Sequence, residues 1–372
     1  MEVKRIFDLL DWMCENYPKE DALAGKRNGV WEKISTEEYR KKAHLLAYGL
    51  HEIGIEKGDK IITITANRPE WNLVDMAVSM LGAVHVPVYP TLNTDSYVHI
   101  FEHSEAKYLF LSNALQFKRV QPALNKMENP PILYSFDPIP GKNFYGDIMK
   151  LGEENQEKNS PLIEEIKKTI KSDDLCSMVY TSGTTGDSKG VMLSHRNLTS
   201  NFIAHSKHMP LTHEHKMLSF LPLCHIYERS MNYHYQYKGI SIYYAESIGT
   251  IAENMKEIHA DGFCTVPRVL ETIASKVFAA GKKLPFFQRQ IYQMAINHGY
   301  KYDYTGKSCW YKMWQKFFDK TIYAKWRASL GGKRMYVISG GSALQQSYVR
   351  LFTAAGIEVY EGYGMTESSP VI

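Results

Sequence analysis

Residues 180–191 read Tyr-Thr-Ser-Gly-Thr-Thr-Gly-Asp-Ser-Lys-Gly-Val. Apolar residues at 175–180 and 191–194 predict a short strand on each side, so the stretch between them is expected to be a loop. Its three glycines let the backbone turn sharply and bring N–H groups close to an anion. Five Ser and Thr hydroxyls can donate to phosphate oxygens, and one lysine adds positive charge. We therefore expect a phosphate-binding loop, whose contact residues are Thr181, Ser182, Gly183, Thr184, Thr185, Gly186 and Lys189.

This loop is not a Walker A loop. A Walker A loop has its lysine directly after the last glycine, whereas Lys189 comes three residues after Gly186 and is itself followed by glycine. A flexible surface loop is the structural alternative. The ordered pattern Thr-Ser-Gly-Thr-Thr-Gly-x-x-Lys-Gly favours phosphate binding.

Six further segments accompany the loop: NRPEW (67–71), GAVHVPVYPT (82–91), LPLCHIYERS (221–230), TVPRVLE (265–271), SGGSAL (339–344) and YEGYGMTESSPV (360–371). With these segments the sequence resembles the AMP-forming adenylate ligases, the superfamily of acyl-CoA synthetases, peptide-synthetase adenylation domains and luciferases. The resemblance covers nearly the whole chain. The forms LPLCHIYER and TVPRVLE are most similar to the long-chain fatty acyl-CoA synthetases.

The resemblance implies a two-step reaction. A long-chain fatty acid carboxylate attacks the α-phosphorus of ATP, pyrophosphate leaves, and the acyl group passes to CoA with release of AMP. The first step needs charge neutralisation and in-line positioning more than covalent help from the protein. The expected cofactors and co-substrates are ATP, Mg²⁺ and CoA. Two alternatives stay open: a ligase for aryl or shorter carboxylic acids, and a non-catalytic nucleotide- or acyl-binding paralogue.

The resemblance also implies roles for individual residues. Thr181 and Glu367 would contact Mg²⁺, a hard cation that prefers oxygen ligands. His225 would lie near the carboxylate and the α-phosphate, where we expect it to orient groups or stabilise charge. The other expected catalytic residues are Lys189, Thr366 and Glu367. The expected nucleotide contacts outside the loop are Gly340, Gly341, Ser342, Ala343, Glu361, Gly362, Tyr363, Gly364 and Thr366. Candidate lining residues for the acyl tail are Tyr227, Met231, Tyr235 and Val266.

Helix and strand patterns alternate along the chain, which predicts an α/β fold with helix-flanked, mostly parallel sheets. A capping box at Ser35–Glu38 predicts a helix towards Ile53, which Gly54 is placed to end. Strands are expected at 60–66, 85–89, 108–111, 217–220, 241–244, 263–266 and 335–338. The stretch 122–171, with Pro-Pro, Pro-Ile-Pro-Gly and a charged run, is interpreted as a loop-rich connection or a subdomain boundary.

The expected domain organisation is one large N-terminal AMP-binding domain over residues 1–372. Its approximate subdomains are 1–171 and 172–372, with a smaller β subdomain. By resemblance, family members continue for roughly 150 to 200 further residues, with a mobile C-terminal domain that carries the adenylation lysine. That domain is not present in this sequence, so we expect the chain alone to bind nucleotide weakly and to be nearly inactive. An uncovered sheet edge near Ile372 would favour a homodimer.

Composition indicates a cytoplasmic protein. The net charge of +4 on 372 residues gives no reason to expect a nucleic-acid partner. No apolar stretch approaches the roughly 20 residues of a membrane helix. The N-terminal residues lack the continuous apolar region of a signal peptide. Five scattered cysteines without a CxxC pair fit free thiols in a reducing compartment.

Residues 281–334 have an unusual composition, with twelve Lys and Arg against two Asp, and thirteen aromatic residues. One interpretation is a set of amphipathic helices with aromatic residues in a core and lysines in solvent. A second is a surface that meets anionic lipid, which would place the protein at the inner face of a membrane. A third is a surface for single-stranded nucleic acid, which the low net charge of the whole chain disfavours.

Overall fold

The computed structural model describes residues 2–181, 187–332 and 334–372. The chain forms two compact units. Unit 1 takes its residues from Met1–Glu214, Pro222–Tyr244 and Met365–Ile372, and unit 2 from His215–Leu221 and Ala245–Gly364. These limits do not coincide with the expected subdomains 1–171 and 172–372. The reason is that strands β8 (Leu175–Thr181) and β9 (Lys189–Ser194) join a sheet built from earlier strands.

The main sheet of unit 1 has the strand order β7-β6-β5-β3-β4-β8-β9. Neighbouring strands are parallel, except that β9 runs antiparallel to β8. The other strands are β3 (Lys60–Ile64), β4 (Val84–Pro87), β5 (Tyr108–Leu111), β6 (Ile132–Ser135) and β7 (Asn143–Phe144). This arrangement confirms the expected α/β fold with mostly parallel pairing.

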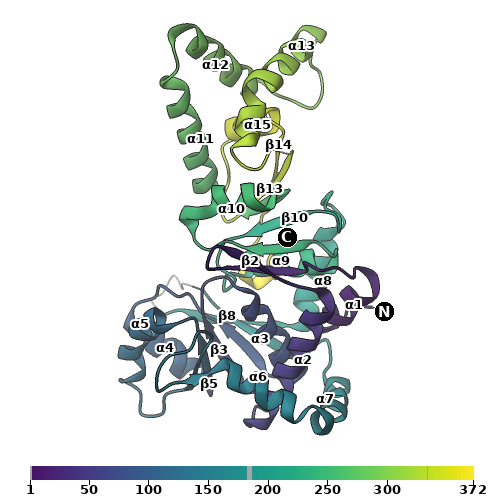
Figure 1. The fold of residues 1–372 in the computed structure, drawn as a ribbon, viewed down its shortest axis with the longest axis vertical. Helices are drawn as coiled ribbons and strands as arrows, with labels where there is room; N and C mark the ends of the chain where they lie inside the picture. Colours follow the sequence, from purple (N-terminus) through teal and green to yellow (C-terminus); the bar gives the residue numbers. More distant parts are fainter. Residues whose placement is uncertain (1, 182–186, 333) are drawn as a thin grey trace. The chain divides into compact units, whose positions relative to one another are not determined.

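Helices cover both faces of this sheet (Figure 1). Helices α4 (Thr94–Ser104) and α5 (Ala114–Leu124) lie on one side, and α2 (Thr36–Glu52) and α3 (Pro69–Met80) on the other. Tyr97, Ile100 and Phe101 of α4 pack with strand residues such as Ile62 and Leu109 in one buried cluster. Burying a side chain of this size contributes about 1.5–3 kcal/mol to stability.

Helix α2 begins and ends where the sequence predicts. The Ser35 hydroxyl accepts a hydrogen bond from the backbone N–H of Glu38 at 3.1 Å. The helix runs to Glu52, and Gly54 has a φ of +90°, which glycine adopts without strain.

The interpretation of 122–171 as a loop-rich connection is wrong. This stretch forms β6, β7 and two helices, α6 (Tyr145–Glu154) and α7 (Gln156–Thr169). Helix α6 packs closely on α2, because a Cβ at Gly152 would lie 1.9 Å from the Leu45 carbonyl oxygen. The charged run forms α7 with Ile163 buried. The close approach of Gly152 to the backbone of α2 joins residues that are far apart in the sequence, so no local sequence pattern predicts it.

Three more strands and three helices complete unit 1. Strand β1 (Leu23–Arg27) pairs antiparallel with β2 (Val30–Ile34) and parallel with β11 (Ser241–Tyr244). The helices are α1 (Asp8–Asn16), α8 (His195–Ser206) and α9 (Ile226–Tyr237).

Unit 2 contains a parallel arrangement of strands in the order β14-β13-β12-β10. These strands are β10 (Lys216–Ser219), β12 (Gly262–Thr265), β13 (Met335–Ser339) and β14 (Ile357–Glu361). The helices of this unit are α10 (Ile251–Ile258), α11 (Pro267–Lys282), α12 (Phe286–Gly299), α13 (Cys309–Phe318), α14 (Ala324–Ala328) and α15 (Gln346–Ala354), with a π-helical turn at Asp319–Tyr323.

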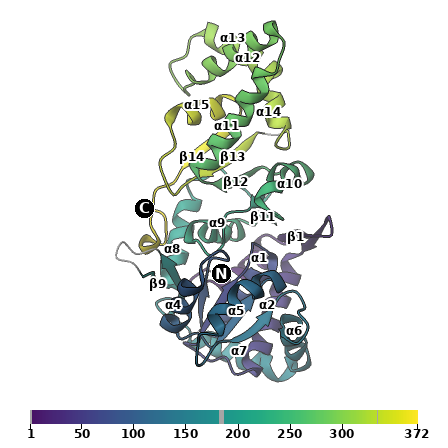
Figure 2. The ribbon, with the colours of Figure 1, turned by 90° about the vertical axis from the view of Figure 1, so that its left-hand side faces the viewer.

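The segment 281–334 is largely helical, as the interpretation as amphipathic helices requires (Figure 2). Its aromatic residues Tyr292, Phe318, Tyr323 and Trp326 form a buried cluster with Leu351 of α15. Among the residues that the structure describes, no helix is long and apolar enough to cross a bilayer.

A buried ion pair joins four elements of unit 1. The Arg229 Nη2 of α9 lies 2.5 Å from the Asp75 Oδ1 of α3. Arg229 also donates to the Ser177 hydroxyl of β8 at 2.5 Å. His85 of β4 lies 2.6 Å from Asp75, and the Tyr233 hydroxyl of α9 donates to Asp75 at 2.6 Å.

The same ion pair controls the ionisation of Asp75. Burial alone would raise the pKa of Asp75, but Arg229 and the hydrogen bonds from His85 and Tyr233 outweigh burial and lower the pKa to about 2. The aspartate is therefore ionised inside the unit, and Arg229 of the LPLCHIYERS segment has a structural role.

We predict that Arg229→Met lowers the free energy of unfolding by about 3–5 kcal/mol, because it leaves the Asp75 carboxylate buried without its counter-charge. Urea unfolding followed by circular dichroism measures this change. Arg196→Met is the matched control, since Arg196 makes a surface ion pair with Asp173 and its loss costs about 0–1 kcal/mol. Equal losses in the two variants would contradict the central role of the buried pair.

Candidate functional site

A cavity of about 620 Å³ opens in unit 1 at the carboxyl ends of β4 and β8. Ligands of α/β sheets bind at this edge, and small-molecule pockets have volumes of about 300–1,000 Å³. The lining combines apolar and polar side chains: Pro87, Val88, Tyr89, Leu92, Asn93, Asp95, Ser96, His99, Ile100, Val179, Tyr180, Thr181, Asp187, Ser188, Cys224, His225 and Thr366. The cavity therefore brings together Thr181, His225 and Thr366 from three separate motifs.

The two flanks of the expected phosphate loop are held side by side. Thr181, the last residue of β8, is the register partner of Lys189, the first residue of β9. Thr181 lines the main cavity, whereas the exposed Lys189 lines a neighbouring hollow of about 390 Å³ together with His99 and Ser188. The loop residues between these flanks, Ser182, Gly183, Thr184, Thr185 and Gly186, lie outside the described residues.

Two histidines of α4 hold the flanks of this loop, and the sequence analysis missed both. His99 Nε2 lies 2.9 Å from the Ser188 carbonyl oxygen, so this nitrogen is the donor. His103 Nδ1 lies 2.7 Å from the Tyr180 hydroxyl. Their spacing of four residues places both rings on one face of α4. That spacing is the one signal that could have found them.

His225 occupies the N-cap of α9. Its Nδ1 accepts a hydrogen bond from the Tyr227 N–H at 3.2 Å. Desolvation lowers the pKa of His225, so the ring is neutral at pH 7 and carries its hydrogen on Nε2. A neutral Nε2–H donor at the cavity suits the orientation of an anionic group, the role that the resemblance implies.

The turn Thr366–Ser368 presents Thr366 to the cavity, while Glu367 is exposed. Asn201 of α8 anchors this turn. Its Nδ2 donates to the carbonyl oxygens of Ser368 at 3.2 Å and Val371 at 2.7 Å, and its Oδ1 accepts from the Val371 N–H at 3.3 Å. Asn201 was not found from the sequence, because a single asparagine on a helix has no distinguishing pattern.

The hydroxyl of Thr181 and the carboxylate of Glu367 have the donor chemistry of a Mg²⁺ site. Both offer oxygen atoms, which Mg²⁺ prefers, and both belong to unit 1. The assignment of Mg²⁺ to these two residues stays a prediction.

The remaining expected nucleotide contacts gather at one edge of the strands of unit 2. The Gly340 N–H donates to the Thr265 carbonyl oxygen at 3.1 Å, and the Gly362 N–H donates to that of Ser339 at 2.9 Å. The Glu361 carboxylate accepts from the Leu344 N–H at 3.1 Å. Gly341, with a φ of +82°, occupies the left-handed region that favours glycine. The structure therefore brings the SGGSAL, YEGYG and TVPR segments together.

Other members of this group are exposed. Tyr363 is 74% exposed, and Ser342, Ala343 and Gly364 are also exposed. Their contact with nucleotide stays a prediction. Of the acyl-tail candidates, Met231 and Tyr235 are buried within α9, and neither lines the cavity of unit 1.

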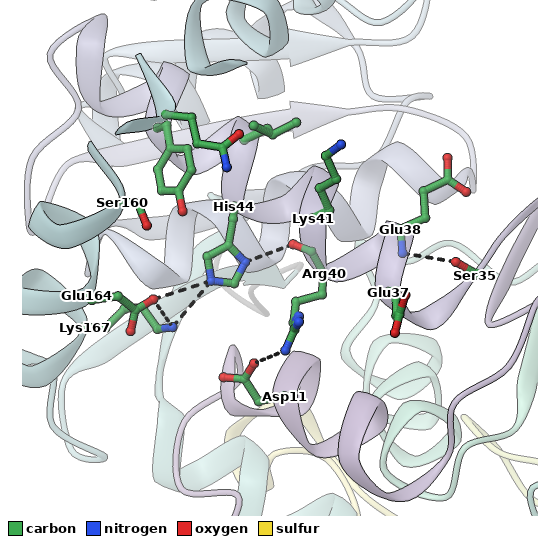
Figure 3. A pocket seen from close by; sticks show the side chains of 13 residues that line it. Asp11, Ser35, Glu37, Glu38, Arg40, Lys41, His44, Ser160, Glu164 and Lys167 are labelled. Atoms are coloured by element: carbon green, nitrogen blue, oxygen red, sulfur yellow. Dashed lines mark hydrogen bonds and ion pairs between the residues drawn. The ribbon is translucent and has the colours of Figure 1, made fainter. Parts of the chain in front are cut away.

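A wider cavity of about 800 Å³ is lined by residues of α1, α2 and α7 and by Ser35 (Figure 3). Four of its charged groups form two ion pairs: Arg40 with Asp11 at 3.3 Å, and Lys167 with Glu164 at 2.8 Å. His44 Nδ1 is bonded to the Arg40 carbonyl oxygen at 2.9 Å. No strand contributes to its lining, and none of the motif residues lies in it. It is therefore not the candidate site.

The sequence pattern of the family described as AMP-binding enzyme matches residues 10–372. The chain belongs to this family. It is 27% identical to the long-chain-fatty-acid–CoA ligase FadD15 of Mycobacterium bovis over 92% of this chain and 57% of the relative. It is also 27% identical to long chain acyl-CoA synthetase 4 of Arabidopsis thaliana, over 97% of this chain and 56% of the relative. The chain spans about half the length of the curated relatives it matches.

Solved structures share this fold. An inhibitor-bound N-terminal domain of FACL13 from Mycobacterium tuberculosis superposes with a TM-score of 0.71 at 19% identity, over 98% of this chain and 77% of that chain. The long-chain-fatty-acid–CoA ligase FadD1 from Archaeoglobus fulgidus superposes with a TM-score of 0.72 at 17% identity, over 99% of this chain and 65% of that chain. The AMP-binding family member therefore has the expected fold of the N-terminal domain of an adenylate-forming ligase.

We predict that Asn201→Ala weakens the binding of AMP about tenfold, because the turn that carries Thr366 loses three hydrogen bonds, each with a net value of about 0.5–1.5 kcal/mol. Isothermal calorimetry with AMP measures the affinity. Ser200→Ala on the exposed face of the same helix is the control. Unchanged affinity in a folded Asn201→Ala variant would show that this turn does not contact the nucleotide.

Proposed function

We propose that this protein is the N-terminal part of an AMP-forming long-chain fatty acid–CoA ligase. In the proposed reaction, the fatty acid is activated by ATP to an acyl-adenylate, and the acyl group is then transferred to CoA. ATP, the fatty acid and CoA are the substrates, and Mg²⁺ is the proposed metal. The chain spans about half the length of the curated relatives it matches.

One observation carries the proposal. Thr181, His225 and Thr366 come from regions far apart in the sequence, yet they line one cavity at the end of β8. If Thr181 only began a surface loop, its position in one cavity with His225 and Thr366 would have no explanation. The arrangement supports a site built for an anionic group beside an apolar one, because Val88, Leu92 and Ile100 line the same cavity.

The residues divide the proposed chemistry among them. The phosphate loop and Lys189 bind the β- and γ-phosphates, and Thr366 donates to the α-phosphate. His225 Nε2–H orients the carboxylate and stabilises negative charge as the adenylate forms. When bound, Mg²⁺ would neutralise phosphate charge through Thr181 and Glu367.

The long-chain acid is supported by the names of the relatives, which are long-chain acyl-CoA ligases at about 27% identity. The cytoplasm is the proposed location, because the five cysteines, Cys14, Cys176, Cys224, Cys264 and Cys309, are free thiols. A homodimer stays a prediction.

Calorimetric titration with acyl-adenylate analogues of two to eighteen carbons, and one aryl analogue, tests the proposal. We predict that affinity rises with tail length by up to about 0.8 kcal/mol per buried CH₂. A Thr366→Val variant, which removes the hydroxyl at similar volume, weakens all of the analogues by a similar factor.

A preference for the short or aryl analogues would show that the substrate is an aryl or shorter acid, while the proposed binding of an adenylate would stand. Tail-dependent binding that Thr366→Val does not weaken would place the ligand outside the cavity. Either result contradicts part of the proposed function.

A further inference from the structure

Helices α12 and α13 of unit 2 are apolar on two faces. On the inner face, Tyr292, Ala295 and Ile296 of α12 and Phe318 of α13 belong to the buried cluster with α15. A helix that only covers a core has one apolar stripe and a polar outer face. The outer faces of these two helices differ from that pattern.

The outer face of α12 carries Phe287, Ile291 and Met294, which are 80%, 40% and 49% exposed. The outer face of α13 carries Trp310, Met313 and Phe317, which are 67%, 50% and 43% exposed. Spacings of three and four residues place each set on one side of its helix. Each helix therefore presents a continuous apolar stripe to solvent.

Positive charge borders these stripes. Residues 281–334 contain twelve Lys and Arg against two Asp, while the whole chain has a net charge of only +4. The rest of the chain is therefore net negative. Helix α12 contains no acidic residue, and Asp319 beside α13 is paired with Arg327 at 2.6 Å.

The cations also converge next to α13. Lys316, Lys320 and Arg334 line a cavity of about 480 Å³ that is bordered by Phe317 and Tyr304. Two carboxylates, Asp319 and Glu358, line the same cavity, and Asp319 is paired with Arg327. Tyr304 is 74% exposed. Phosphate groups of lipids lie just outside the acyl chains of a bilayer, so cations beside an apolar stripe match the order of layers at a membrane surface.

We propose that the outer faces of α12 and α13 form a docking surface for a bilayer that carries anionic phospholipids. The apolar stripes enter the boundary between headgroups and acyl chains, and the flanking lysines and arginines bind lipid phosphates. Both helices lie beyond α15 from strands β13 and β14 (Figures 1 and 2).

Vesicle flotation with the 372-residue chain tests this proposal. One set of vesicles contains phosphatidylcholine alone, and the other contains phosphatidylcholine with phosphatidylglycerol. We expect binding to the anionic vesicles at low salt, at least about tenfold weaker binding to the neutral ones, and loss of binding at high salt.

Two double variants and one control double variant locate the surface. Phe287→Ser with Trp310→Ser removes one large exposed side chain from each stripe and should weaken binding at least about tenfold. The matched control is Leu115→Ser with Ile248→Ser, because these side chains are 73% and 78% exposed elsewhere on the chain. Lys283→Glu with Arg289→Glu should weaken binding by roughly fivefold or more per residue.

A second measurement reports how deeply Trp310 inserts into the bilayer. Lipids brominated on their acyl chains should quench Trp310 fluorescence in the wild-type chain, and Trp310→Phe should remove most of this quenching. Absence of binding at low salt, or equal binding by the stripe variants and their controls, would overturn the proposal. Self-association of the chain that the stripe variants abolish, without vesicle binding, would assign the surface to a second copy and would also overturn it.

Discussion

The buried ion pair between Arg229 and Asp75 is the constraint on which unit 1 depends. Arg229 also donates to Ser177 at 2.5 Å, so this one side chain ties helix α9 to strand β8. His225 lies four residues before Arg229, and Thr181 lies four residues after Ser177. The contact in the core therefore sets the separation of two residues at the cavity. Because an unpaired buried charge costs several kcal/mol, α9 and α3 cannot move apart independently, and the hydrogen bond to Ser177 adds β8 to this group.

The sequence predicts the elements that carry strong local patterns. Strands 108–111 and 241–244 have the expected limits, because each is a short apolar run bounded by polar or turn-forming residues. Residues 122–171 were interpreted wrongly, because their order comes from the close approach of Gly152 to α2. Such a contact between distant backbones has no periodic signal. Arg229 of LPLCHIYERS was assigned no role from the sequence, and only its buried partners reveal a structural one.

Some residues of the candidate site were likewise predicted from the sequence, and others were not. Thr181, His225 and Thr366 were found because their motifs are ordered and rich in small or hydroxyl-bearing residues, and the structure brings them to one cavity. His99, His103 and Asn201 were missed because they act through hydrogen bonds to backbone or hydroxyl groups that are distant in the sequence. Motif residues thus indicate the chemistry, while the residues that position them require the tertiary structure.

Hydrogen–deuterium exchange with and without a saturating alkyl ester of AMP distinguishes the cavity of Thr181, His225 and Thr366 from the charged cavity lined by α1, α2 and α7. The account predicts slower exchange at 179–181, 188–190, 225–228 and 365–371, and no change in the helices around the charged cavity, α2 and α7. Slower exchange confined to α2 and α7, or no change anywhere under saturation, would contradict the assignment of the nucleotide to the cavity of Thr181, His225 and Thr366.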